Sequence, residues 1–314
     1  MPHAAYWLPA SDETPLYTRH WATEQPARGV VMLSHGMAEH GGRYERLGQA
    51  LNSAGYHLYA IDQRGHGRTA ENGELGHYAD HGGWGKVVGD LATLNRHIRQ
   101  QHPRLPIVLL GHSMGSYIGT AYLIEHSASV QGAVLSGSNY QPVALYRSVR
   151  PIARFERWRQ GPLGRSALIE WLSFGSFNKA FKPNRTPFDW LSRDPLEVDK
   201  YVADPLCGFR CSNQLWLDLL GGLAELTPVS RLARIESGLP MLIIGGERDP
   251  VSQGKRLRKL ADALTRAGVR DVQLQIYPDA RHELFNETNR DEVIRNLIGW
   301  LDKVSHRHTN EETP

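Results

Sequence analysis

The 314-residue sequence is poor in cysteine, with only Cys207 and Cys211. These residues are four positions apart, so a disulfide between them across one helical turn would be geometrically awkward. Two thiolates are also too few for a structural zinc site. We therefore expect two reduced thiols, which are typical of a reducing compartment such as the cytoplasm.

Long hydrophobic runs are missing as well. No stretch approaches the ~20 apolar residues of a membrane-spanning helix, and the first residues, MPHAAYWLPASDE, lack the basic start and apolar core of a secretory signal. The net charge of +3 is too small to indicate a nucleic-acid partner. The length is sufficient for one large α/β domain, and we expect a cytoplasmic protein.

The residues that are present are organised around the stretch 105–126. An apolar segment at 106–110 has the length and β-branched content of a buried strand. The sequence Gly-His-Ser-Met-Gly follows at 111–115, and then apolar residues recur at helical spacing. A strand, a G-x-S-x-G motif and a helix form a nucleophile elbow. Such a turn strains the backbone at Ser113 and requires small residues at positions 111 and 115.

Strands and helices alternate along most of the chain. We expect strands at 5–8, 16–21, 29–34, 56–61, 106–110, 130–135, 239–245 and 271–277, with helices at 43–54, 84–98, after Gly115, 253–266 and 288–304. The first two strands are expected to form a hairpin or meander. This order predicts an α/β fold with a mostly parallel central sheet flanked by helices. The order breaks over 138–212, which predicts a helical cap inserted into a core formed by 1–137 and 213–314.

Functional groups of a parallel sheet gather at the carboxyl ends of its strands. Asp249 follows the strand at 239–245, and His282 follows the strand at 271–277. The order Ser113, Asp249, His282 is the one this elbow requires. His282 can accept the serine proton, and a carboxylate behind the imidazole fixes its tautomer. Glu247 and Asp279 are alternative choices for that carboxylate.

An oxyanion formed at Ser113 needs two N–H donors. One is the amide of Met114, directly after the nucleophile, and the other is expected from the glycine-rich loop 35–42, with the Met37 amide preferred. The loops also carry His35, His40 and His66. Isolated histidines on such loops more often form local hydrogen bonds, so we expect no metal site and no cofactor.

Six segments together resemble the monoacylglycerol lipase and lysophospholipase branch of the α/β-hydrolases. They are SHGMAEHGGRY at 34–44, DQRGHGRT at 62–69, LLGHSMG at 109–115, VDKYVADPL at 198–206, GGERDPV at 245–251 and YPDARHELFNE at 277–287. The resemblance implies a triad of Ser113, Asp249 and His282, an oxyanion hole of the Met37 and Met114 amides, and a cap that admits one acyl chain. Ser116 departs from the family, which often has glycine there, and the cap sequence at 138–197 matches poorly.

The predicted cap is rich in aromatic residues and in arginine. Its large apolar side chains could form an acyl tunnel and a lipid-facing rim, or could simply pack the cap onto the core. They are Phe155, Trp158, Leu163, Leu168, Ile169, Trp171, Leu172, Phe174, Phe177, Phe181, Phe188 and Trp190. Six arginines lie between 147 and 165 and could meet an anionic lipid surface or could form a solvated helix face.

These features predict a serine hydrolase that cleaves single-chain lipid esters, lysophospholipid or monoacylglycerol, through an acyl-enzyme, with transient membrane contact through the cap. Three alternatives stay open on the same fold. The acyl chemistry could be that of a thioesterase or acyltransferase, or of an aminopeptidase, although an aminopeptidase needs acidic groups for the substrate ammonium and the cap is basic. A lipid-binding protein without turnover is the third alternative.

Overall fold

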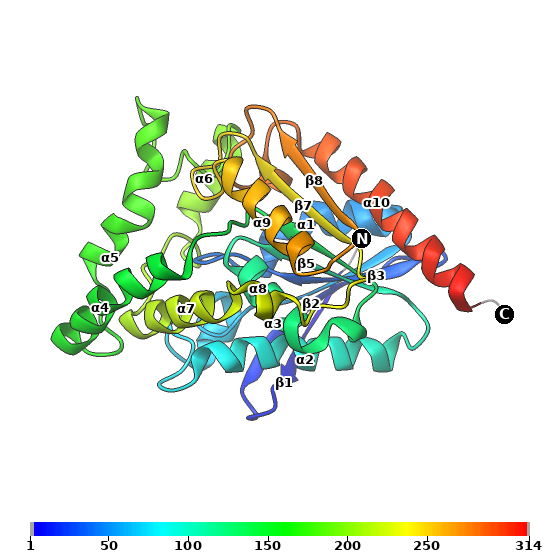
Figure 1. Ribbon diagram of the computed structural model, residues 1–314, viewed down its shortest axis with the longest axis horizontal. Coiled ribbons are helices and arrows are strands. Elements are labelled where there is room, and N and C mark those ends of the chain that lie inside the picture. The colour runs from blue at the N-terminus through cyan, green and yellow to red at the C-terminus, as the bar shows by residue number, and fades with distance from the viewer. Residues whose placement is uncertain (1–2, 313–314) are drawn as a thin grey trace.

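The protein is built on one eight-stranded sheet, which a computed structural model describes together with its helices over residues 3–312 (Figure 1). The strands lie side by side in the order β1-β2-β4-β3-β5-β6-β7-β8. Their bounds are β1 (His3–Pro9), β2 (Pro15–Trp21), β3 (Gly29–Ser34), β4 (Tyr56–Ile61), β5 (Ile107–His112), β6 (Gly132–Ser136), β7 (Met241–Gly246) and β8 (Val272–Tyr277).

Six neighbouring strands, from β4 to β8 in the sheet, run parallel, whereas β1 and β2 pair antiparallel at one edge. This arrangement confirms the expected α/β sheet and its opening hairpin. Strand β7 begins two residues later than expected because Leu239 closes a turn with Glu236 through a 3.1 Å backbone hydrogen bond. Strands β3 to β7 are buried throughout, as near-continuous apolar runs predict.

Helices cover both faces of the sheet. One face packs against α2 (Gly83–Gln101), α3 (Met114–His126), α7 (Asn213–Leu226) and α9 (Lys255–Arg266), and the other against α1 (Glu45–Ser53) and α10 (Arg290–Glu312). Alternate strand residues divide between the two faces: Val30 and Met32 point to the first, Val31 and Leu33 to the second. The expected helix at 43–54 begins as a 3₁₀ turn, η1 (Gly41–Tyr44), before α1.

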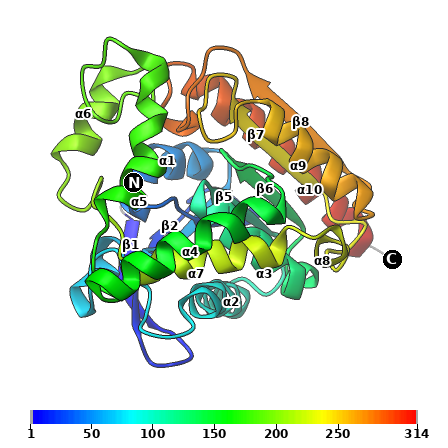
Figure 2. The same cartoon turned by 60° about the vertical axis from the view of Figure 1, so that its left-hand side comes forward.

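The chain between β6 and β7 is largely helical. It contains α4 (Val143–Gln160), α5 (Ala167–Leu172), the 3₁₀ segment η4 (Phe174–Phe181), α6 (Pro195–Ala203), α7 and α8 (Val229–Leu232). Helices α4 and α5 form the left-hand end of the molecule in Figure 1. Helix α4 packs along α7, which also packs against α2 and α3 (Figure 2). The segment therefore rests on the core through α7.

Side-chain caps fix where several of these helices begin. Ser166, Asp194 and Ser212 accept backbone hydrogen bonds from the first turns of α5, α6 and α7, respectively. Four short 3₁₀ segments complete the chain: η2 (Gly67–Asn72), η3 (Ser127–Ser129), η4 and η5 (Leu284–Asn286). The two cysteines are free, as expected. Over residues 3–312 no helix is both long and apolar enough to cross a bilayer.

Candidate active site

Ser113 occupies the turn between β5 and α3 with φ 51° and ψ −121°, a conformation that L-residues rarely adopt. Its amide donates to the Ser136 carbonyl oxygen on β6 at 2.9 Å. A Cβ at position 115 would lie 2.0 Å from the Ser34 carbonyl oxygen, and one at position 111 would lie 2.6 Å from the Gly115 carbonyl oxygen. The turn therefore has the strain and the two small residues that the sequence predicts.

His282 and Asp249 meet at the carboxyl end of the sheet, on the loops after β8 and β7. The His282 Nδ1 atom lies 3.0 Å from an oxygen of Asp249, although the approach departs from the geometry of a good hydrogen bond. The other Asp249 oxygen accepts from the Val251 amide at 2.8 Å. Asp249 is completely buried and His282 nearly so. The carboxylate is thus fixed on both sides, and Nε2 is the ring nitrogen left for other partners.

The surroundings of His282 set its proton affinity. Burial by itself lowers the pKa of this imidazole, but the adjacent Asp249 carboxylate outweighs burial and raises the pKa above its usual 6.5, with smaller contributions from Glu283 and Glu39. The rings of His112 and Trp190 lie 4.8 and 5.0 Å from the imidazole, centroid to centroid. These rings pack beside the imidazole and limit the access of water. The electrostatic interaction between Asp249 and His282 is therefore screened less than it would be in solvent.

The two alternative carboxylates lie elsewhere. Glu247 and Asp279 are both exposed, and the Asp279 amide donates to Glu247 at 3.3 Å. The buried carboxylate in contact with His282 is therefore the preferred one, Asp249.

The loop after β3 contains Met37, whose amide is expected to be the second oxyanion donor. Gly36 lies so close to the nucleophile that a Cβ there would be 3.3 Å from the Ser113 Cβ. Ala38 has a φ of 53°, a strained value for a residue with a Cβ. Its carbonyl oxygen accepts from the Tyr201 hydroxyl at 2.9 Å and from the Gly208 amide at 3.0 Å. Two residues from the 138–212 segment therefore hold the loop on which Met37 lies.

A buried charge network supports the same loop. Glu39 accepts from the Gly36 amide at 2.5 Å, from the Tyr44 hydroxyl at 2.9 Å and from Arg43 at 2.9 Å. Arg43 also bonds Glu283, next to His282, at 2.7 Å and through a second, shorter contact. Burial tends to raise the pKa of Glu39, but Arg43 lowers it to about 2, so the carboxylate stays ionised. Arg43 thereby ties the loop after β3 to the loop after β8, which carries His282.

The sequence patterns predicted no role for Glu39, Arg43 or Glu283. The first two lie in the SHGMAEHGGRY segment, where an acid and a base four residues apart were the available signal. Glu283 gave no separate signal because its partner is 240 residues away.

A pocket joins these groups. It is lined by Gly36, Met37, Ala38, Glu39, His112, Ser113, Glu170, Phe174, Phe188, Trp190, Leu191, Tyr201, Gly208, Phe209, His282 and Glu283. Ser113 and His282 therefore line one cavity together with residues of the loop after β3 and aromatic residues of the 138–212 segment. Its free volume is about 30 Å³, room for roughly two water molecules.

The large apolar side chains of the 138–212 segment divide into two groups. Phe174, Phe177, Phe181 and Phe188 pack with Trp190 above the pocket. Trp158 and Trp171, in contrast, are 79% and 58% exposed. Some members of the set are thus packed together and others are exposed, and the acyl tunnel and the lipid-facing rim stay predictions.

The loop histidines make local bonds. His35 donates through Nδ1 to the Gly36 carbonyl oxygen at 2.8 Å and accepts through Nε2 from the Gln63 amide at 2.9 Å. His66 bonds the Arg64 carbonyl oxygen at 2.9 Å, and burial lowers its pKa to about 3. His40 bonds Asp204 at 2.9 Å. His35 and His66 thus have local partners, whereas His40 offers a ligand atom within 4.8 Å of those of Asp204 and Cys207. The absence of a metal site on these loops stays a prediction.

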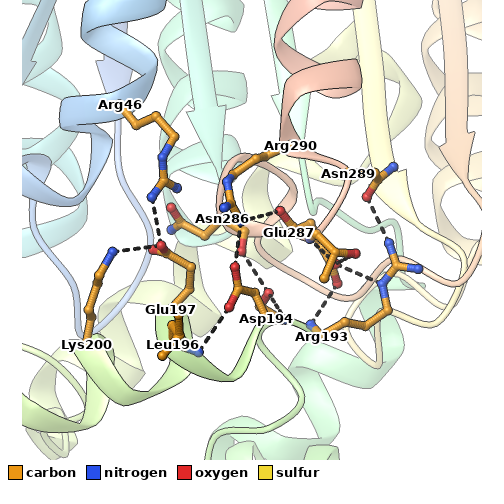
Figure 3. A network of polar contacts seen from close by, with 12 residues as sticks. Arg46, Arg193, Asp194, Leu196, Glu197, Lys200, Asn286, Glu287, Asn289 and Arg290 are labelled. Carbon is orange, nitrogen blue, oxygen red and sulfur yellow. Dashed lines mark hydrogen bonds and ion pairs between the residues drawn. The ribbon is translucent and has the colours of Figure 1, made fainter.

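A second polar network fastens residues 193–200 of the 138–212 segment (Figure 3). Fully buried Glu287 accepts from Arg193 Nε at 2.8 Å and from the Arg281 amide, next to His282, at 2.8 Å. Arg290 bonds Asp194 at 2.7 Å. The Glu287 carboxylate therefore holds both the loop that carries His282 and Arg193, which lies just before α6.

Known proteins share this architecture. Residues 25–289 match the family described as serine aminopeptidase, S33. The chain is 33% identical over 286 residues to the monoacylglycerol lipase of Mycolicibacterium smegmatis, covering 91% of each chain. It is 29% identical over 307 residues to human monoglyceride lipase, covering 96% of this chain and 90% of that one.

Among solved structures, a thermostable carboxyl esterase from Bacillus coagulans superposes with a TM-score of 0.89 at 25% identity, covering 97% of this chain and 99% of the other. The sheet, the elbow and the extent of these matches lead to one assignment. The chain belongs to the serine aminopeptidase S33 family, with the α/β-hydrolase fold.

Proposed function

We propose that this protein is a monoacylglycerol lipase in which Ser113 is the nucleophile, His282 the general base and Asp249 the residue that orients the base. The observation that carries the proposal is the contact between buried Asp249 and His282 beside the pocket that Ser113 lines. The curated relatives named as monoacylglycerol and monoglyceride lipases support the ester and its single acyl chain.

The chemistry follows from these positions. His282 Nε2 removes the Ser113 proton as the serine oxygen attacks the ester carbonyl, and Asp249 stabilises the imidazolium through Nδ1. The Met37 and Met114 amides stabilise the oxyanion of the tetrahedral intermediate, each contributing about 3 kcal/mol. Collapse transfers the proton from His282 to the departing glycerol oxygen and leaves an acyl-serine. Water, activated by the same histidine, then releases the fatty acid.

We further propose that residues 138–212 form a cap over a core made of 1–137 and 213–314, and that this cap selects the substrate. Burial of each acyl methylene contributes ~0.8 kcal/mol, so the tail should dominate binding over a head group held by one or two hydrogen bonds. The aromatic cluster around Trp190 supports an apolar path for that tail.

Aminopeptidase activity, which the family's description names, requires an unpaired carboxylate for the substrate ammonium. Three acidic residues line the pocket, but Glu39 and Glu283 are already paired with Arg43. Burial raises the pKa of the third, Glu170, which disfavours its charged form. The pocket therefore suits a neutral ester better than a peptide amine.

The test is a substrate panel on the purified protein. One arm varies the acyl length of 1-monoacylglycerols, and a second varies the head group at fixed length, using lysophosphatidylcholine, acyl-CoA and an aminoacyl amide. We expect kcat/KM to rise with tail length and to be highest for the monoacylglycerol. Preference for the aminoacyl amide or the thioester would contradict the proposal.

The nucleophile is tested with Ser113→Ala, which should lower kcat on the order of 10⁶-fold and abolish fluorophosphonate labelling. Ser148→Ala, on exposed α4, is the matched control and should retain both. Full activity of the Ser113→Ala variant, or absence of labelling in the wild-type protein, would show that another residue or another function is involved.

Transient contact with an anionic membrane is the second part of the proposal, through the outer surface of α4 and α5. Seven of the ten exposed large apolar side chains among the described residues lie on α4, on α5 or in the turn between them: Leu145, Phe155, Trp158, Leu163, Leu168, Trp171 and Leu172. The basic residues Arg147, Arg154 and Arg159 are exposed on the same helix as Trp158. Apolar side chains beside arginines match an anionic lipid surface.

Sedimentation with phosphatidylglycerol–phosphatidylcholine vesicles tests this contact. The double substitution Trp158→Ser and Trp171→Ser should release the protein into the supernatant, whereas Trp7→Ser, at a 40% exposed tryptophan of β1, should not. Equal binding of the wild type and both variants would exclude this surface as the contact. Binding that does not depend on the phosphatidylglycerol fraction would also exclude it.

A further inference from the structure

Three histidines from separate parts of the chain converge beside the edge strands. His20 lies on β2, His57 on β4 and His102 at the end of α2. One ring nitrogen from each lies within 4.8 Å of the others. His20 Nε2 is 3.3 Å from His57 Nδ1, and the rings of His57 and His102 stack with centroids 4.4 Å apart. The fold thus gathers three imidazoles that are 37 and 45 residues apart in sequence.

This histidine cluster is remote from the candidate active site. His57 pairs with Val30 in the parallel sheet, and Val30 pairs with Ile107, the first residue of β5. Ser113 lies six residues further along that strand, which corresponds to about 20 Å at 3.3 Å per residue. The cluster is therefore at the amino end of the parallel strands, and nothing bound there can take part in the ester chemistry.

The spacing of two of the three nitrogens matches that of neighbouring ligands of a metal ion, and all three lie within 4.8 Å of one another. Zinc–imidazole bonds of 2.0–2.1 Å place neighbouring nitrogens of a tetrahedral site about 3.3 Å apart, the separation of His20 Nε2 and His57 Nδ1. The His57 nitrogen also accepts from the Thr23 amide at 3.3 Å. Both of these bonds are long, so an ion could replace them at small cost.

We propose that His20, His57 and His102 bind one divalent ion of the imidazole-preferring class, with Zn²⁺ as the representative. Three imidazoles leave a fourth position for water, which solvent can reach because His20 and His102 are only partly buried. Ions of this class, Zn²⁺, Cu²⁺ and Ni²⁺, favour nitrogen ligands over the oxygen ligands that Mg²⁺ and Ca²⁺ require.

Tyr59 orients two of the three ligands. Its hydroxyl lies 2.9 Å from His102 Nε2, which leaves Nδ1 of that ring as the free nitrogen. Its ring stacks on His20 with centroids 3.9 Å apart and planes 13° from parallel. Metal-binding histidines are commonly held through their second nitrogen in this way.

An ion at this place would fasten the antiparallel edge to the parallel core, since its ligands come from β2, β4 and the end of α2. In the unfolded chain the same ligands are dispersed, so binding favours the folded state. The proposed role is therefore stabilisation of the fold, independent of the lipase proposal.

Calorimetric titration of Zn²⁺ into chelator-treated, untagged protein tests the site. We expect one ion per chain, a higher Tm with Zn²⁺, and nitrogen hyperfine structure in the electron paramagnetic resonance spectrum of the Cu²⁺ form. His20→Phe keeps an aromatic ring against Tyr59 but removes a ligand, and should weaken binding by more than the 10- to 100-fold that outer partners contribute. Tyr59→Phe keeps the stack and should weaken binding about tenfold.

His126→Phe, which replaces an exposed histidine outside the cluster, is the matched control and should bind as the wild type does. Melting of each variant without metal shows that it is folded, and ester hydrolysis should be unchanged in all of them. The proposal is overturned if the wild type binds Zn²⁺ no more tightly than folded His20→Phe, or if His126→Phe loses binding equally.

Discussion

The Tyr201 hydroxyl donates a hydrogen bond to the carbonyl oxygen of Ala38, 163 residues earlier in the chain, at 2.9 Å. Ala38 directly follows Met37, whose amide is the proposed second oxyanion donor, and its φ of 53° is strained. The hydroxyl thus holds the loop in a conformation it would not favour alone.

Tyr201→Phe should therefore affect catalysis more than binding. A lost buried hydrogen bond costs about 1 kcal/mol, and a displaced oxyanion donor lowers kcat, so we expect a fall in kcat of about tenfold with little change in KM. Tyr56→Phe removes a tyrosine hydroxyl that bonds Asp302 at 2.7 Å on another part of the fold, and should leave kcat unchanged. Steady-state kinetics on a soluble ester separates the two constants. A raised KM at constant kcat would place Tyr201 in substrate binding instead.

The pH profile should report the Asp249–His282 pair. His282 must be neutral to act as a base, and its pKa lies above the usual 6.5, so kcat/KM should fall as the pH drops through that raised value. Asp249→Asn removes the main cause of the increase and should shift the acid limb to lower pH, while the maximal rate falls about 10⁴-fold. An acid limb that stays in place in the variant would show that another group titrates.

The buried Glu287 carboxylate should contribute substantially to the stability of the fold. Glu287→Gln removes the buried carboxylate that receives Arg193 and the Arg281 amide, and hydrogen bonds to a charged group each contribute about 1.5–3 kcal/mol. We expect a clear fall in the urea midpoint. Glu71→Gln breaks an exposed pair with Arg68 and should change the midpoint little. Equal midpoints for the two variants would refute this role.

The elbow should not tolerate a methyl group at position 115. Gly115→Ala would place a Cβ 2.0 Å from the Ser34 carbonyl oxygen, so β3 and the oxyanion loop after it must move. We expect loss of activity together with a lower Tm. Gly89→Ala, in α2 with open space around it, should instead stabilise the protein by about 0.5–1 kcal/mol. Thermal unfolding and esterase rates of both variants test this prediction. An unchanged Tm in Gly115→Ala would contradict the close approach of position 115 to the Ser34 carbonyl oxygen.

The elements with regular periodicity could be predicted from the sequence, and the tertiary pairings could not. The apolar runs at 29–34 and 56–61 became β3 and β4 with the expected bounds, because buried parallel strands leave a continuous signal. The elbow and the loops after β7 and β8 followed from the rule that groups gather at strand ends. The Arg43–Glu283 contact and the His20–His57–His102 cluster depend on contacts between distant segments, which no local pattern encodes.

The 138–212 segment was the least predictable part. Its aromatic content was visible, but whether Trp158 faced water and Trp190 faced His282 depended on how α4 and η4 are placed over the pocket. Periodicity assigns a side chain to a face of its own helix, and it cannot specify what that face meets.

All of α4 to α8 is inserted between β6 and β7, two strands that lie next to each other in the sheet. The ends of this excursion are therefore fixed by strand pairing whatever its length or content. In a segment exchanged between homologues, the contacts of Tyr201, Gly208 and Arg193 with the loops beneath are therefore ones to preserve. Substrate preference can thus differ between homologues while the reaction that they catalyse stays the same.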